Sequence, residues 1–167
     1  MITWIHPIVV HFVIGLLLLG TLFDVIGALR KSERFLFAGF CNVLAAAICA
    51  IVAVASGLLA EANLGAHSNI GNALLGFHKT FAIVVMLLTI ALAGWRLAMR
   101  GGLHHKMRTI YLAIAFTACA LLFFTGGIGG VLVYWYGLGL PPETARRVIE
   151  AQPRTVPQPT PAAVSKP

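Results

Sequence analysis

PIVVHFVIGLLLLGTLFDVIGAL, residues 7–29, contains one carboxylate, Asp24, and one histidine, His11, in an otherwise apolar run. A helix rises 1.5 Å per residue, so about 20 residues cross the roughly 30 Å of hydrocarbon in a bilayer. No basic residue precedes the run, and its apolar core is longer than the roughly 15 residues of a signal peptide. The stretch therefore predicts a transmembrane helix that stays in the mature protein.

Three more stretches of the same kind follow it. Charged residues make up 10% and hydrophobic residues 59% of the 167 residues, whereas charged residues alone reach about a quarter of a soluble domain. Short connections between the stretches favour helices that alternate in direction. The sequence therefore predicts an all-α protein, an integral membrane four-helix up-and-down bundle, whose further spans are residues 35–60, 74–99 and 109–136.

The basic residues indicate how the bundle sits in the membrane. They concentrate between spans one and two and between spans three and four, whereas the loop between spans two and three carries only Lys79. Short loops rich in lysine and arginine stay on the cytoplasmic side. We therefore expect a multi-pass protein of the bacterial inner membrane, in contact with lipid, with both termini periplasmic. The net charge of +7 reflects this topology and gives no reason to expect nucleic acid.

The chain divides into residues 1–140, a four-span transmembrane domain, and residues 141–167, a periplasmic tail. Within the tail, residues 143–151 have the composition of a short surface helix, and the proline-rich remainder predicts a largely disordered segment. No clear internal repeat, phosphate-cradling loop or nucleophile triad is apparent.

Four histidines fall on the outer side of this topology. Pro7 suits the first position of a helix, which places His6 at the membrane surface and His11 about 6 Å deeper. His67 falls in the loop between spans two and three, and His78 falls inside span three. Spans one and three run in the same direction, so we expect His11 and His78 to reach similar depths and to face each other.

Two neutral imidazoles from different helices are the ligands of six-coordinate haem b, and bundle interiors hold such cofactors. We therefore predict His11 and His78 as the metal ligands, with His6 and His67 hydrogen-bonded around them or, as an alternative, forming a second site. Glycines at this level let a flat porphyrin approach the helices, and Gly15, Gly126 and Gly130 are the candidates.

Other interpretations of the histidines stay open. Intramembrane histidines also serve to hydrogen-bond neighbouring helices, which would make the protein a cofactor-free scaffold subunit of a larger membrane complex. A copper or other transition-metal site is a further alternative, since imidazole suits these ions. His6 and His11 are separated by about 140° around a regular helix, so a site using both would need a frayed turn.

Asp24 and Arg96 lie near the cytoplasmic ends of spans one and three at matching depths. A single charge near the bilayer core costs at least about 2.5–3.5 kcal/mol, so such groups pair or serve a pathway. We predict a structural ion pair between Asp24 and Arg96, with a proton path as the alternative.

Three segments carry a resemblance to a known family: HPIVVHFVIGLLLLGTLFD at residues 6–24, SGLLA at 56–60 and GGIGGVLVYWYGLGL at 126–140. They resemble the four-span membrane family called domain of unknown function 2231, which typically opens with His-Pro-x-x-x-His-Phe and closes with Gly-Gly-x-x-Val-Tyr-x-x-Gly. Val13 stands where that family often has proline. The resemblance covers about residues 5–140 and implies the four-span topology, with an association with redox gene products as a looser expectation.

The hypothesis that follows is a b-type cytochrome-like electron-transfer subunit. It would hold haem near the outer face and pass electrons between a quinol or membrane partner and a periplasmic redox protein. Such a protein is an accessory subunit rather than an independent enzyme.

Overall fold

The computed structural model describes residues 5–62, 69–99 and 105–151, and every regular element within these ranges is a helix. Four long helices come first: α1 (Ile5–Arg30), α2 (Glu33–Glu61), α3 (Asn69–Ala98) and α4 (His105–Tyr134). Each is long and apolar enough to cross a membrane. A short helix, α5 (Pro142–Glu150), follows. The predicted four-helix membrane bundle is confirmed.

The helices differ from the predicted spans mainly at their ends. α3 and α4 begin at Asn69 and His105, several residues before the expected starts near 74 and 109. Helical hydrogen bonding continues past the apolar core into polar residues, where water satisfies the exposed ends. Apolar content therefore locates the middle of each span better than its limits.

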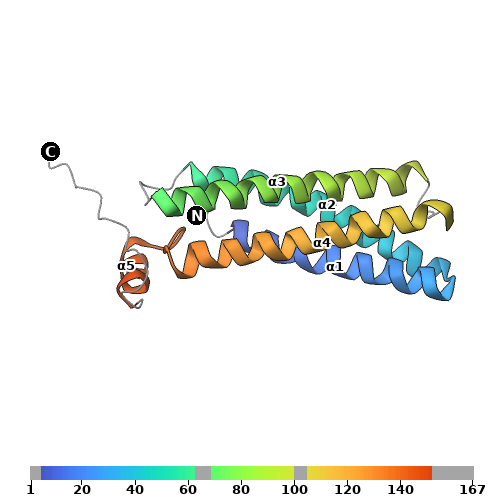
Figure 1. Ribbon diagram of the computed structural model, residues 1–167, viewed down its shortest axis with the longest axis horizontal. Helices are drawn as coiled ribbons and strands as arrows, with labels where there is room; N and C mark the ends of the chain where they lie inside the picture. The colour runs from blue at the N-terminus through green and yellow to red at the C-terminus, as the bar shows by residue number, and fades with distance from the viewer. Residues whose placement is uncertain (1–4, 63–68, 100–104, 152–167) are drawn as a thin grey trace.

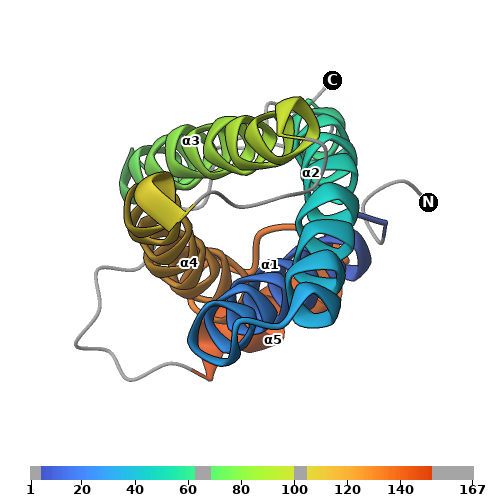
Figure 2. The same ribbon diagram turned by 90° about the vertical axis from the view of Figure 1, so that its right-hand side faces the viewer.

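Consecutive long helices run antiparallel and lie side by side along the bundle (Figure 1). Viewed from one end they form a four-cornered ring in chain order, with α1 diagonally opposite α3 and α2 diagonally opposite α4 (Figure 2). Each helix packs against its two neighbours in the ring. α1 and α3 are parallel, so residues at the same depth on these two helices meet only at the centre of the bundle.

α1 and α2 approach each other closely because glycines of α1 face large residues of α2. A Cβ atom on Gly20 would lie 2.9 Å from Val43, and one on Gly27 would lie 2.8 Å from Leu36. Small residues at such contacts let helix backbones approach in a membrane, where packing rather than hydrophobicity drives association.

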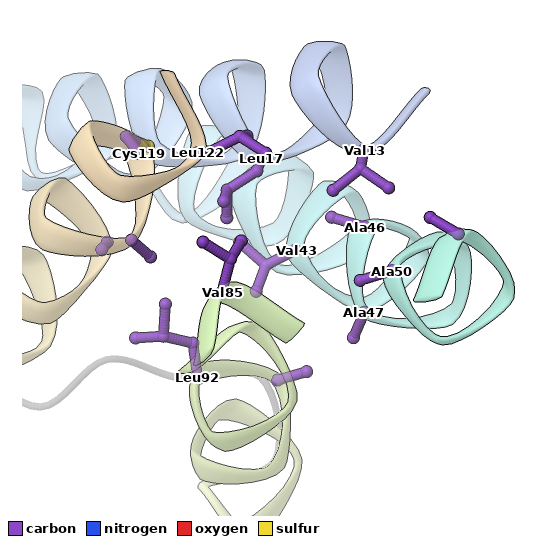
Figure 3. Packing of buried hydrophobic residues seen from close by; sticks show 14 of the residues in the cluster. Val13, Leu17, Val43, Ala46, Ala47, Ala50, Val85, Leu92, Cys119 and Leu122 are labelled. Atoms are coloured by element: carbon purple, nitrogen blue, oxygen red, sulfur yellow. The ribbon is translucent and has the colours of Figure 1, made fainter. Parts of the chain in front are cut away.

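A dry apolar core fills the middle of the bundle. Side chains from all four helices meet there, among them Leu17, Val43, Val85 and Leu122 (Figure 3). Phenylalanines such as Phe37 and Phe123 lie on the outside, as expected for surfaces that face lipid. The core separates a polar group near one end of the bundle from a second near the other end.

α5 lies beyond the end of the bundle at which α1 begins (Figure 1). The chain turns out of α4 through Gly137 and Gly139, whose φ angles are 64° and 79°, values that glycine adopts without strain. α5 begins and ends one residue before the surface helix expected at residues 143–151. The rest of the expected tail, residues 152–167, lies outside the described residues.

Candidate functional site

His6 is held against α2 near the end of the bundle at which α1 begins. Its Nδ1 lies 2.9 Å from the carbonyl oxygen of Ala53 and 3.5 Å from the hydroxyl of Ser56. The ring packs over Gly57, where a Cβ atom would come within 2.9 Å of it. Any other residue at position 57 would therefore displace the imidazole.

His78 is held against α4 by an equivalent set of contacts. Its Nδ1 lies 3.0 Å from the carbonyl oxygen of Thr125. The ring packs over Gly129, where a Cβ atom would approach it to 3.1 Å. In both cases the helix that follows in the chain supplies one carbonyl oxygen and, four residues later, one glycine.

The sequence spacing of the two sets is the same. Each histidine lies 47 residues before the carbonyl that its Nδ1 contacts. His6 and His78 are separated by 72 residues, as are Ala53 and Thr125 or Gly57 and Gly129. We call each set of histidine, carbonyl and glycine a histidine seat. The sequence reading found no repeat, but the structure contains the same seat twice.

The two seats bring the imidazoles together. The ring centroids of His6 and His78 are 6.4 Å apart, and the ring planes are nearly perpendicular, at 81°. A carbonyl oxygen only accepts hydrogen bonds, so each Nδ1 carries the proton and donates it to its carbonyl. A neutral imidazole then has an unprotonated Nε2, the usual form of a metal-binding histidine.

His11 does not join this pair, which corrects the expectation that it faces His78. Its ring lies on the exposed side of α1, and its Nδ1 contacts the carbonyl oxygen of Pro7 at 2.6 Å. The rotation of about 140° between His6 and His11 means that turning one inward turns the other outward. His67 falls outside the described residues.

The candidate glycines do not touch the imidazoles. A Cβ atom on Gly15, Gly126 or Gly130 would meet nothing within 4 Å. Gly126 helps to line a cavity of about 230 Å³ between α1 and α4, together with Gly127, Ile14, Leu122 and Phe123. The glycines that shape the seats, Gly57 and Gly129, were not among the sequence candidates.

A second polar group lies toward the opposite end of the bundle. Asp24 and Arg96 form the expected ion pair, with Oδ1 and Nη1 2.6 Å apart and both side chains fully buried. The Tyr111 hydroxyl donates to Oδ2 of Asp24 at 3.0 Å, and Arg96 also donates to the Leu36 carbonyl. Within the described ranges, no buried side-chain nitrogen or oxygen lacks a partner.

Gly39 and Tyr111 are parts of this group that the sequence reading missed. A Cβ atom on Gly39 would overlap Oδ1 of Asp24 at 2.2 Å, so glycine makes the room for the carboxylate. The Tyr111 ring lies 5.5 Å from the guanidinium carbon of Arg96, within range of a cation–π contact. Neither residue stands out in an apolar helix until its neighbours are known.

His6 and His78 lie close enough together that both imidazoles could be ligands of one metal centre. In the described part of the chain, no group of three or more histidine, cysteine, aspartate or glutamate residues gathers to hold a bare ion.

Comparison with known proteins identifies the family of this chain. No curated protein and no solved structure matches the chain. A family model described as "predicted membrane protein (DUF2231)" matches residues 3–142, which include all four long helices. The chain therefore belongs to the family of predicted membrane proteins called DUF2231.

Proposed function

We propose that this protein is an electron-transfer subunit that holds haem b between His6 and His78. The observation that carries the proposal is the pair of matching histidine seats, which present two Nδ1-bonded imidazoles to each other 6.4 Å apart. Compared with the sequence hypothesis, His6 replaces His11 as the partner of His78.

The surrounding residues supply what axial ligands require. The carbonyls of Ala53 and Thr125 fix the tautomer and the orientation of the rings, and a hydrogen bond at Nδ1 makes the other nitrogen a stronger ligand. Gly57 and Gly129 let the rings lie flat against their helices. Haem supplies one-electron redox chemistry, and its potential depends on the axial ligands and on burial. The donor would be a quinol or a membrane partner, and the acceptor a periplasmic redox protein.

The cavity between α1 and α4 lies on the same stretch of α4 as the seat of His78. Gly126 and Gly127 line the cavity. Thr125 and Gly129, which contact the ring of His78, lie on either side of these two glycines in the sequence. The space above Gly126 and Gly130, where a Cβ atom would meet nothing, offers room for the edge of a flat ring system. These glycines therefore keep a supporting role in the proposal.

Substitution of the histidines tests the proposal. The variants His6→Ala and His78→Ala are each expected to lose the low-spin haem spectrum or to become high-spin, because one axial ligand is gone. His11→Ala is the matched control: its ring is exposed on the same helix, so its spectrum should not change. The measurement is the reduced-minus-oxidised absorption spectrum of protein purified from the membrane fraction.

Three outcomes would contradict the haem assignment. One is an unchanged low-spin spectrum in both His6→Ala and His78→Ala. A purified protein with bound metal but no Soret band would favour copper or zinc at the same two imidazoles. Protein that inserts normally but contains neither haem nor metal would favour a scaffold subunit held together by the histidine hydrogen bonds.

The side of the membrane is a separate prediction. We propose that the protein lies in the bacterial inner membrane with both termini periplasmic, because Arg30, Lys31 and Arg34 lie where α1 meets α2, whereas the connection between α2 and α3 at the opposite end, residues 62–68, contains no lysine or arginine. A phosphatase reporter fused after residue 136 should be active, and one inserted at residues 101–106 should be inactive. The reverse pattern would place the imidazole pair on the cytoplasmic side.

A further inference from the structure

The spacing of 72 residues extends well beyond the histidine seats. Position by position, residues buried in the first helical hairpin, α1 and α2, match residues buried in the second, α3 and α4. The buried matches on α1 and α3 are Val13 with Val85, Leu17 with Thr89 and Asp24 with Arg96; those on α2 and α4 include Val43 with Ala115, Ala46 with Ala118, Ala50 with Leu122 and Ala53 with Thr125. The same face of each helix is therefore turned inward in both hairpins.

Two of the matched pairs touch each other directly. His6 contacts His78 near one end of the bundle, and Asp24 contacts Arg96 about 18 residues, or roughly 27 Å, farther along. Equivalent residues that meet must lie beside the axis that relates the two hairpins. This axis therefore runs along the centre of the bundle, parallel to the helices, as in membrane proteins built from parallel repeats.

At one end of the axis the two matched residues are both histidines, His6 and His78. At the other end they carry opposite charges, Asp24 and Arg96. Two copies of the first hairpin, arranged in the same way, would bring Asp24 against Asp24, and two copies of the second would bring Arg96 against Arg96. Both charges are fully buried, so either arrangement would bury like charges without compensation. Like charges brought together in this way select against the wrong partner.

We infer that the chain contains two equivalent hairpins, residues 5–62 and 69–134, whose facing surfaces recognise each other, and that Asp24 and Arg96 make the unlike pairing the favoured one. The partner of each surface is thus a hairpin of this same design with the opposite charge on the axis. This inference does not depend on haem.

Charge exchange in the full-length chain tests the inference. Asp24→Arg and Arg96→Asp, each alone, place like charges on the axis and should lower the folded fraction at a fixed temperature in detergent by at least about tenfold. The double variant Asp24→Arg/Arg96→Asp restores opposite charges at equivalent positions and should regain most of the loss. Gly94→Ala on α3, where a Cβ atom meets nothing, is the control for substitution in a long helix.

A second arm uses two differently tagged chains expressed together, one with Asp24→Arg and the other with Arg96→Asp. If they exchange hairpins, opposite charges meet on both axes, so the tags should copurify, whereas two wild-type tags should not. The connection from Ala62 to Asn69 can extend about 24 Å, which exceeds the roughly 8–10 Å between neighbouring helices. Recovery in either arm supports the inference. Loss of folded protein in both arms, or full stability of either single variant, overturns it.

Discussion

Replacement of Arg96 by glutamine is expected to lower the free energy of unfolding by about 3–5 kcal/mol, because it leaves the Asp24 carboxylate fully buried without its cation. Glutamine keeps hydrogen-bonding capacity but removes the charge, so the loss reports the charge rather than the shape. Thermal unfolding in detergent, followed by circular dichroism, is the measurement.

A double-mutant cycle isolates the interaction between the two residues. Asp24→Asn/Arg96→Gln should be more stable than Arg96→Gln alone, because no charge is left unpaired. Strictly additive losses would mean that the ion pair contributes no coupling energy. A fully stable Asp24→Asn protein that loses only a proton-coupled activity would instead favour a proton path through Asp24.

The variant Gly39→Ala is expected to destabilise the bundle although it adds a single methyl group. The new Cβ atom would lie 2.2 Å from Oδ1 of Asp24 and 3.0 Å from the backbone oxygen of Gly20. Arg96 and Tyr111 hold the carboxylate in place, so the helices must separate. Overpacking of this kind costs about 1–3 kcal/mol, and any displacement of the buried ion pair adds to it.

Gly94→Ala is the matched control for Gly39→Ala, since both change one glycine within a long helix. Nothing lies within 4 Å of a Cβ atom at position 94, so alanine should raise stability by about 0.5–1 kcal/mol through its higher helix propensity. Equal effects of the two substitutions on the thermal transition would rule out close packing of Asp24 on Gly39.

The depth of each residue in the membrane could be predicted from the sequence. The spans follow from apolar length, and the Asp24–Arg96 contact follows from two charges at matching heights on parallel helices. A buried charge has few possible partners in an apolar bundle. Position along the helix, counted in steps of 1.5 Å, was therefore enough to pair these residues.

The rotation of each helix about its own axis could not be predicted from the sequence in the same way. α1 is apolar on all sides, so hydrophobicity does not distinguish the face that carries His6 from the face that carries His11. Close glycine contacts decide the orientation instead: Gly20 and Gly27 fit α2, and Gly57 receives the ring of His6. Comparison of the two hairpins at an offset of 72 residues would have indicated His6, because His6 and His78 then match as Gly57 and Gly129 do.

The position of the imidazole pair has an electrical consequence. His6 is the second residue of α1, but His78 is the tenth residue of α3, so the pair lies inside the bundle, about 14 Å from the end at which α3 begins. Moving one charge through the full voltage drop involves about 2.3 kcal/mol per 100 mV, and a charge that reaches the pair from the nearer end of the bundle crosses only part of that drop. Asp24 and Arg96 carry opposite charges at one depth near the other end of the bundle, so voltage exerts no net pull on them. A charge that reached the imidazoles from that side would therefore respond to only part of the membrane potential.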